Sequence, residues 1–196
     1  MARPKQNHSK PRESILEAAT GLFSETGYAG TTIRDIAKVV GVLPGSLYAH
    51  IDNKETLLLE IVETGIDRFL DAAKAVDGDA PPAERMRLAI QAHVAVVAEN
   101  PQRTLVVFHQ WRYLTGPNRS RIVKKRHRYE DIYRAIMTDG VRSGDFDSGL
   151  DAKIAVLAIL GALNWTAEWF KPDGPDGAEQ IGDRMATSLL RGVLSE

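Results

Sequence analysis

Apolar residues recur every three or four positions along almost the whole chain, and this helical spacing constrains the fold more than any other feature. Glycine, proline and capping residues interrupt the pattern, notably at Gly27, at Gly41 and across 78–82. No segment alternates apolar and polar residues as a half-buried strand does. The sequence therefore predicts an all-α protein of about nine helices.

Capping residues place several of the helix starts. Three such starts are expected, at Thr32 with Asp35, at Ser148 with Asp151, and at Asp52 or Asn53. The expected helices occupy approximately residues 15–26, 32–40, 44–50, 53–76, 83–99, 101–115, 118–142, 151–170 and 177–193.

The composition limits the classes of protein that this chain can belong to. Its 196 residues, 43% of them hydrophobic, suffice for a small domain and a medium one. No apolar run approaches the roughly 20 residues of a membrane helix, and no signal peptide follows Met1, so we expect a cytoplasmic protein without membrane contact. The absence of cysteine excludes disulfides and thiolate sites, and the histidines lack ligand spacing, so no metal or cofactor is expected.

The charge is distributed unevenly although its sum is only −1. Any nucleic-acid binding must therefore depend on local charge. Residues 1–12 contain Arg3, Lys5, Lys10 and Arg12 and no acid. Such a segment is either a solvated tail or, beside a DNA-binding motif, a basic arm.

Residues 32–50 have the pattern of a helix-turn-helix, two short helices joined by a tight turn. Ala37 is small where the helices must cross, and Gly41 permits a positive φ in the turn. Val42 and Leu47 are expected to close a small core. A hairpin of this composition also occurs as a purely structural element, so the pattern alone leaves both interpretations open.

A longer string resembles the N-terminal signature of the TetR family of transcriptional regulators. The matching segments are 15–19 (ILEAA), 31–37 (TTIRDIA), 45–50 (GSLYAH) and 53–58 (NKETLL). Ile51 replaces the usual phenylalanine, and Leu43 and Pro44 replace more polar residues, so the family's base preference does not carry over. The resemblance implies a DNA-binding domain at 1–53 and a helical effector-binding and dimerisation domain at 54–196.

The resemblance also implies which side chains meet DNA. The residues expected to contact phosphates are Thr32, Tyr48, His50 and Lys54. Base edges are expected to be read by Pro44, Gly45 and Ser46, with a contribution from Arg34. Arg3 and Lys5 are expected to enter a minor groove. Three alternatives stay open. Tyr48 could instead be a packing residue, and His50 could be an ordinary cation at the end of a helix. Arg34 could instead form an ion pair with a nearby acid.

The C-terminal half contains an apolar helix that suits a subunit interface. Residues 154–163 are apolar all round, which indicates burial on every side. The residues expected at a two-fold, four-helix interface are Ala155, Ala158, Gly161, Ala162, Leu189, Leu190 and Val193. An ordinary monomer core is the alternative. A homodimer implies a palindromic operator with half-sites about 34–36 Å apart or a multiple of that spacing.

Aromatic residues gather on two predicted helices and suggest an effector pocket. Phe108 and Trp111 lie on one, and Trp165 and Trp169 lie four positions apart on the other, with core packing as the alternative. Residues 164–174 (NWTAEWFKPDG), with 126–130 and 144–146, resemble a TetR branch that responds to acyl-CoA thioesters.

The run 119–128 adds six cations, Arg126 among them, that suit CoA phosphates. The alternative is a solvated face paired with acids such as Glu130 and Asp131. Glu168 stands where some members of the branch carry arginine, and an acid there would repel the ligand.

The sequence thus favours a repressor that a small-molecule effector, by resemblance an acyl-CoA thioester, releases from DNA. No catalytic motif is present, so an enzyme is not expected. Two alternatives stay open: a small-molecule enzyme using Glu168 or His109, and a helical binding scaffold with a purely structural helix-turn-helix.

Overall fold

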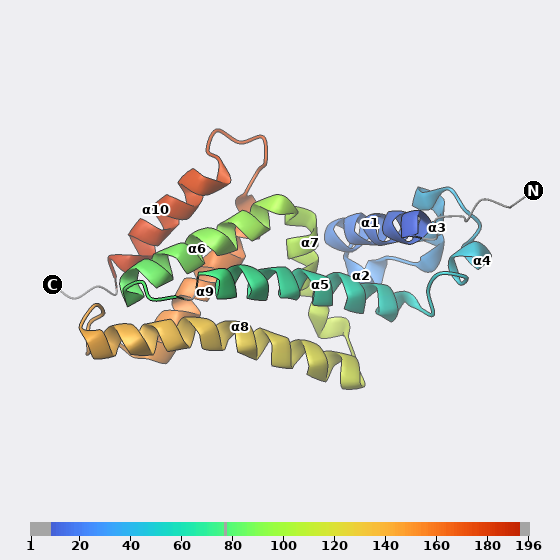
Figure 1. The fold of residues 1–196 in the computed structure, drawn as a ribbon. Coiled ribbons are helices and arrows are strands. Elements are labelled where there is room, and N and C mark those ends of the chain that lie inside the picture. The colour runs from blue at the N-terminus through green and yellow to red at the C-terminus, as the bar shows by residue number, and fades with distance from the viewer. Residues whose placement is uncertain (1–8, 77, 193–196) are drawn as a thin grey trace, which may run out of the picture.

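The computed structural model describes residues 9–76 and 78–192, and every regular element in that part of the chain is helical (Figure 1). The N-terminal elements are α1 (Ser9–Glu25), α2 (Gly27–Gly30), α3 (Ile33–Val40), α4 (Pro44–Leu47) and α5 (Lys54–Ala75). The remaining elements are α6 (Pro82–Glu99), α7 (Pro101–Leu105), the π-helical turn η1 (Val106–Gln110), the 3-10 turn η2 (Trp111–Tyr113), α8 (Gly116–Ser143), α9 (Ala152–Trp169) and α10 (Ala178–Leu190).

The molecule is elongated, with a small N-terminal head at one end and a larger helical body at the other (Figure 1). Helices α1 to α4 form the head, and α5 runs from the head into the body. Among the described residues, no helix has the length and hydrophobicity needed to cross a lipid bilayer.

Local capping explains the shape of the helix-turn-helix. The Thr32 side chain accepts from the Asp35 amide, and the Asp35 carboxylate accepts from the Thr32 amide, so the predicted capping box is confirmed. Gly41 ends α3 with φ 78°, a left-handed conformation that glycine adopts without strain. Ala37 and Leu47 are buried between the helices as expected, whereas Val42 is 41% exposed and does not close the core.

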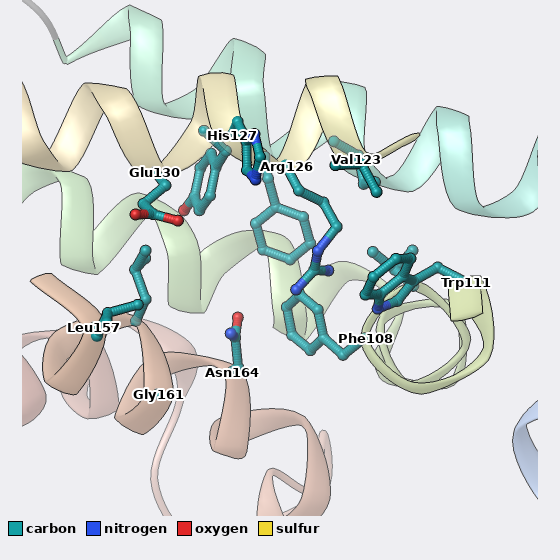
Figure 2. A pocket seen from close by; sticks show the side chains of 14 residues that line it. Phe108, Trp111, Val123, Arg126, His127, Glu130, Leu157, Gly161 and Asn164 are labelled. Carbon is teal, nitrogen blue, oxygen red and sulfur yellow. The ribbon is translucent and has the colours of Figure 1, made fainter. Parts of the chain in front are cut away.

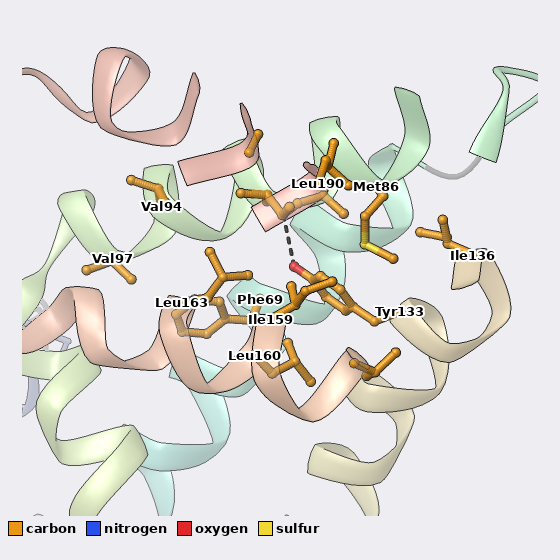
Figure 3. Packing of buried hydrophobic residues seen from close by; sticks show 14 of the residues in the cluster. Phe69, Met86, Val94, Val97, Tyr133, Ile136, Ile159, Leu160, Leu163 and Leu190 are labelled. Carbon is orange, nitrogen blue, oxygen red and sulfur yellow. Dashed lines mark hydrogen bonds between the residues drawn. The ribbon is translucent and has the colours of Figure 1, made fainter. Parts of the chain in front are cut away.

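Two buried clusters stabilise the head and the body. The head cluster includes Ile15, Phe23 and Leu47 but also Val107 of η1 and Ile122 of α8. The body cluster contains Tyr133, whose hydroxyl donates to the Ala89 carbonyl at 2.9 Å (Figure 3). Helix α5 contributes to both clusters. The head is therefore packed continuously onto the body, and a boundary at residue 53 stays a prediction.

Several predicted helices differ from those observed. The expected helix at 101–115 breaks at η1 and η2, and the expected helix at 44–50 ends at Leu47. The predicted Ser148–Asp151 capping box is wrong, since Asp151 is itself the N-cap and accepts from the amides of Lys153 and Ile154.

Candidate DNA-binding surface and effector pocket

The predicted DNA contacts of the helix-turn-helix lie on the outer end of the head (Figure 1). The exposed ones are Thr32, Arg34, Pro44, Gly45, Ser46 and Tyr48. Tyr48 is 59% exposed, so packing does not hold its ring, and Arg34 has no ion-pair partner among the described residues. His50 is half-buried, and its carbonyl accepts from Arg12. Arg3 and Lys5 lie outside the described residues.

Lys54 takes part in contacts that the sequence did not reveal. Its Nζ donates to the carbonyls of Tyr28 and Thr31, both at 2.7 Å, and lies 4.1 Å from the centre of the Tyr28 ring. Burial lowers the pKa of this amine. Lys54 therefore links α2 and its C-cap residue Thr31 to α5. The predicted phosphate contact did not include this structural role.

A cavity of about 400 Å³ lies in the body between α5, η1, α8 and α9 (Figure 2). Its apolar lining consists of Ile66, Phe69, Val107, Phe108, Trp111, Val123, Leu157 and Leu160. Its polar lining includes Arg126, His127, Tyr129, Glu130 and Asn164. An apolar cavity of this size with a few polar groups is typical of a small-molecule site.

The structure brings together only part of the predicted effector site. Phe108, Trp111 and Arg126 line the cavity, whereas Trp165 and Trp169 do not. Trp165 follows the cavity residue Asn164 by one position, about 100° further round α9. The two tryptophans are consequently 63% and 44% exposed.

Unpaired arginines surround the Trp111 indole. The Arg126 and Arg119 guanidinium carbons lie 4.8 Å and 5.8 Å from its ring centre. Burial, and then the nearby charge of Arg112, lower the pKa of Arg126. None of these three arginines has an ion-pair partner in the described part of the chain. Positive charge is therefore concentrated beside the cavity, and the carboxylate of Glu130, which also lines the cavity, offsets only part of the charge on Arg126.

The rest of the basic run is partly neutralised, though not by the acids that the sequence suggested. Arg121 and Lys125 pair with Glu63, and Lys125 also pairs with Asp67. Glu130 pairs with Arg134. The interpretation as a paired surface thus holds for Arg121 and Lys125, whereas Arg119 and Arg126 turn toward Trp111.

Glu168 is held away from the cavity. Its carboxylate lies 2.7 Å from Nε2 of His109, and neither residue lines the cavity. The two weak candidates for catalysis thus form a pair on a partly exposed surface. Glu168 therefore does not contact a ligand that fills the cavity.

The predicted dimer interface is divided between two environments. Ala158 and Gly161 are exposed on α9, Ala155 and Ala162 are half-buried, and Val193 lies outside the described residues.

Two residues of α10 that were predicted at the interface pack against their own chain. Leu190 is only 2% exposed inside the body cluster (Figure 3), and Leu189 packs against the same cluster. The reason is that α10 packs on α6 of its own chain, where a Cβ on Gly182 would lie 3.2 Å from Cα of Gln91.

A polar contact joins the cavity segment to the head. Oε1 of Gln110, at the end of η1, accepts from the Tyr28 amide of α2 at 3.0 Å. The rings of Tyr28 and Tyr113 lie 5.5 Å apart. Sequence reasoning missed this contact because the two partners are 82 positions apart and no local pattern marks them.

Comparison with known proteins decides the family. Residues 15–61 match the bacterial regulatory proteins of the tetR family, and residues 79–193 match the tetracyclin repressor-like C-terminal domain. The chain belongs to the TetR family. It is thus a DNA-binding transcriptional regulator and not an enzyme, and the all-α fold predicted from the sequence is confirmed.

Several TetR relatives resemble the chain over nearly its full length. The HTH-type transcriptional repressor KstR2 of Mycobacterium tuberculosis is 27% identical over 187 residues, 94% of each chain. The structure of that ketosteroid regulator superposes with a TM-score of 0.89, covering 94% of this chain and 95% of the other. The fatty acid metabolism regulator protein of Bacillus subtilis is 25% identical over 91% of this chain and 93% of its own.

A further TetR structure contains both a coenzyme A thioester and operator DNA. AibR in complex with isovaleryl coenzyme A and operator DNA is 30% identical, with a TM-score of 0.81, covering 91% of this chain and 97% of the other. Regulators of the TetR family bind operator DNA and small-molecule effectors, and this chain belongs to that family.

Proposed function

We propose that this TetR regulator is a homodimeric repressor that leaves a palindromic operator when an acyl-CoA thioester enters the cavity. The observation that carries the proposal is the apolar cavity lined by Arg126, with Arg119 beside the Trp111 ring that also lines it. Neither arginine has an ion-pair partner in the described part of the chain. Aliphatic and aromatic side chains suit an acyl group. Arginines without carboxylate partners suit the phosphates of the CoA handle.

The relatives support this choice of effector. AibR was crystallised with isovaleryl coenzyme A, and another relative is named for fatty acid metabolism. The His109–Glu168 pair keeps the one doubtful acid outside the cavity. The chemistry of the cavity lining and the names of the relatives thus favour the same class of ligand, the acyl-CoA thioesters.

The head presents its predicted DNA contacts outward. Pro44, Gly45 and Ser46 form the exposed start of α4, where a recognition helix meets base edges. The hydroxyls of Thr32 and Tyr48, exposed beside them, suit phosphate contacts. Arg34, free of ion pairs among the described residues, is a further cation on this surface.

Helix α9 offers a surface for a second copy of the chain. Its exposed apolar residues are Ile154, Leu157, Ala158, Gly161, Trp165 and Trp169. They recur at helical spacing, so they form one stripe along α9. An apolar stripe of this extent marks an interface on a water-soluble protein. We assign the dimer contact to α9, and two heads related by the resulting two-fold axis would require a palindromic operator.

Native mass spectrometry tests this function. A duplex enriched from random oligonucleotides is mixed with the protein, and octanoyl-CoA is then added. We expect a dimer–duplex complex before the addition, and a dimer carrying octanoyl-CoA together with free duplex after it. A protein that enriches no duplex, or a complex that persists at saturating octanoyl-CoA, would contradict the proposal.

A further inference from the structure

Two residues that line the cavity have polar groups without hydrogen-bond or ion-pair partners among the described residues. Nε1 of Trp111 is fully buried and meets no hydrogen-bond acceptor among the described residues. A buried N–H without an acceptor is unfavourable, and such groups are rare in folded proteins. An acceptor from outside the chain would resolve this imbalance.

The Arg126 guanidinium, which lies beside Trp111, also lacks an acceptor among the described residues. Figure 2 shows its guanidinium between the Phe108 ring and the Trp111 indole, inside the cavity. The guanidinium is stacked 4.8 Å from the indole centre, so its position is fixed, yet no carboxylate pairs with it in the described part of the chain. Five N–H donors in a rigid plane are well suited to bind an oxygen acceptor.

The other cavity-lining groups do not satisfy these donors. The Tyr129 hydroxyl is engaged with Nδ1 of His93 at 2.8 Å and with the Tyr133 hydroxyl at 3.0 Å. The Glu130 carboxylate accepts from Arg134 on the next turn of α8. The donors at Trp111 and Arg126 therefore have no acceptor within the described part of the chain.

We infer that the cavity binds an acyl compound by its carbonyl or carboxylate oxygen, with Trp111 Nε1 and Arg126 as the two donors. This assignment rests on the proposed function, and it adds which ligand atom is recognised and by which side chains. The hydrocarbon part of the ligand then lies against Phe69, Phe108 and Leu160. A carboxylate and a thioester share this oxygen chemistry, so the experiment must separate the two sources.

Calorimetry with three matched probes tests the assignment. The probes are octanoyl-CoA, the thioether S-octyl-CoA, which lacks only the carbonyl oxygen, and free octanoate. We expect octanoyl-CoA to bind the wild-type protein about tenfold more tightly than S-octyl-CoA, as the loss of a hydrogen bond to a charged donor predicts. Binding of octanoate as tight as that of octanoyl-CoA identifies a carboxylate ligand, and weaker binding identifies a thioester.

Two variants connect this preference to its donors. Trp111→Phe keeps an aromatic ring but removes the N–H, and Arg126→Gln removes the guanidinium. Each removes one of the two donors and should lower the affinity ratio of octanoyl-CoA to S-octyl-CoA toward one. The matched control is Arg128→Gln, which removes an exposed arginine of α8 outside this cavity and should leave the ratio unchanged. If Trp111→Phe does not fold, Arg126→Gln alone decides.

The outcomes separate this inference from the proposed function. Equal affinity of the wild type for thioester and thioether, or a ratio unaffected by both variants, overturns the inference even if octanoyl-CoA releases DNA. Oxygen-dependent binding that leaves operator affinity unchanged overturns the proposed function alone. Failure of all three probes to bind overturns both.

Discussion

At the scale of the single residue, Lys54 stabilises the head through contacts with two backbone carbonyls. Lys54→Met removes both charge-assisted hydrogen bonds, so we expect the free energy of unfolding to fall by about 1–3 kcal/mol. Urea denaturation measures this change. Lys124→Met, at an exposed position of α8, is the matched control and should change stability by less than about 0.5 kcal/mol. If Lys54→Met has the same stability as the wild type, Lys54 does not stabilise the head, and the predicted DNA contact is its remaining role.

His93 gives the fold a defined pH dependence. Burial lowers its pKa to about 3 from the ordinary value of 6.5. Between these values the unfolded chain binds a proton that the folded protein does not, so stability falls as the pH drops below 6.5. From pH 7 to pH 5, His93 should remove about 2 kcal/mol from the free energy of unfolding.

The comparison with His93→Gln isolates this contribution. The variant should lose about 2 kcal/mol less than the wild type between pH 7 and pH 5, as urea unfolding at the two pH values measures. Identical pH dependence of the two proteins would show that folding leaves the pKa of His93 unchanged, which would contradict this account.

At the scale of the element, the irregular segment η1–η2 connects the cavity to the head. Phe108 and Trp111 line the cavity, while Gln110 of the same segment bonds to Tyr28. Gln110→Ala should therefore keep effector affinity but reduce, about fivefold, the factor by which effector weakens operator binding. Gln102→Ala, exposed on α7, is the control. Operator affinities with and without octanoyl-CoA measure the factor, and an unchanged factor in Gln110→Ala would exclude this route.

The same segment shows where sequence patterns stop being informative. Caps depend on residues three positions apart, so the Thr32–Asp35 box and the turn at Gly41 were predictable. The π-helical turn at 106–110 has no such local signal. Its geometry accompanies packing against α1 and α5, which sequence spacing does not reveal.

The proposed dimer surface illustrates a second limit of sequence reasoning. Helical periodicity identifies an apolar face but not what covers it. Leu190 proved to be covered by its own chain, whereas Trp165 is left exposed. Phe108, Trp111 and Arg126 were predicted from clustered aromatic and basic residues and from a family resemblance, but the unsatisfied Trp111 N–H required coordinates.

At the scale of the whole molecule, the apolar stripe of α9 determines the oligomeric state that we propose. Trp165→Glu places a charge in the centre of that stripe, so burial in an interface becomes unfavourable and the dimer should dissociate at least about 100-fold more readily. Sedimentation analysis measures the dissociation constant. Thr187→Glu adds the same charge to the exposed face of α10 and should leave the dimer intact. A dimer unaffected by Trp165→Glu would place the interface elsewhere.

The central claim is that a ligand in the α5–α9 cavity controls DNA binding by the distant head. Its most direct test is fluorescence anisotropy of a labelled operator bound to the protein, titrated with octanoyl-CoA. We predict that the anisotropy falls to that of free duplex, and that Arg126→Gln needs at least about tenfold more ligand for the same release. Anisotropy that stays constant at saturating ligand, or that falls identically in Arg126→Gln, would contradict the account.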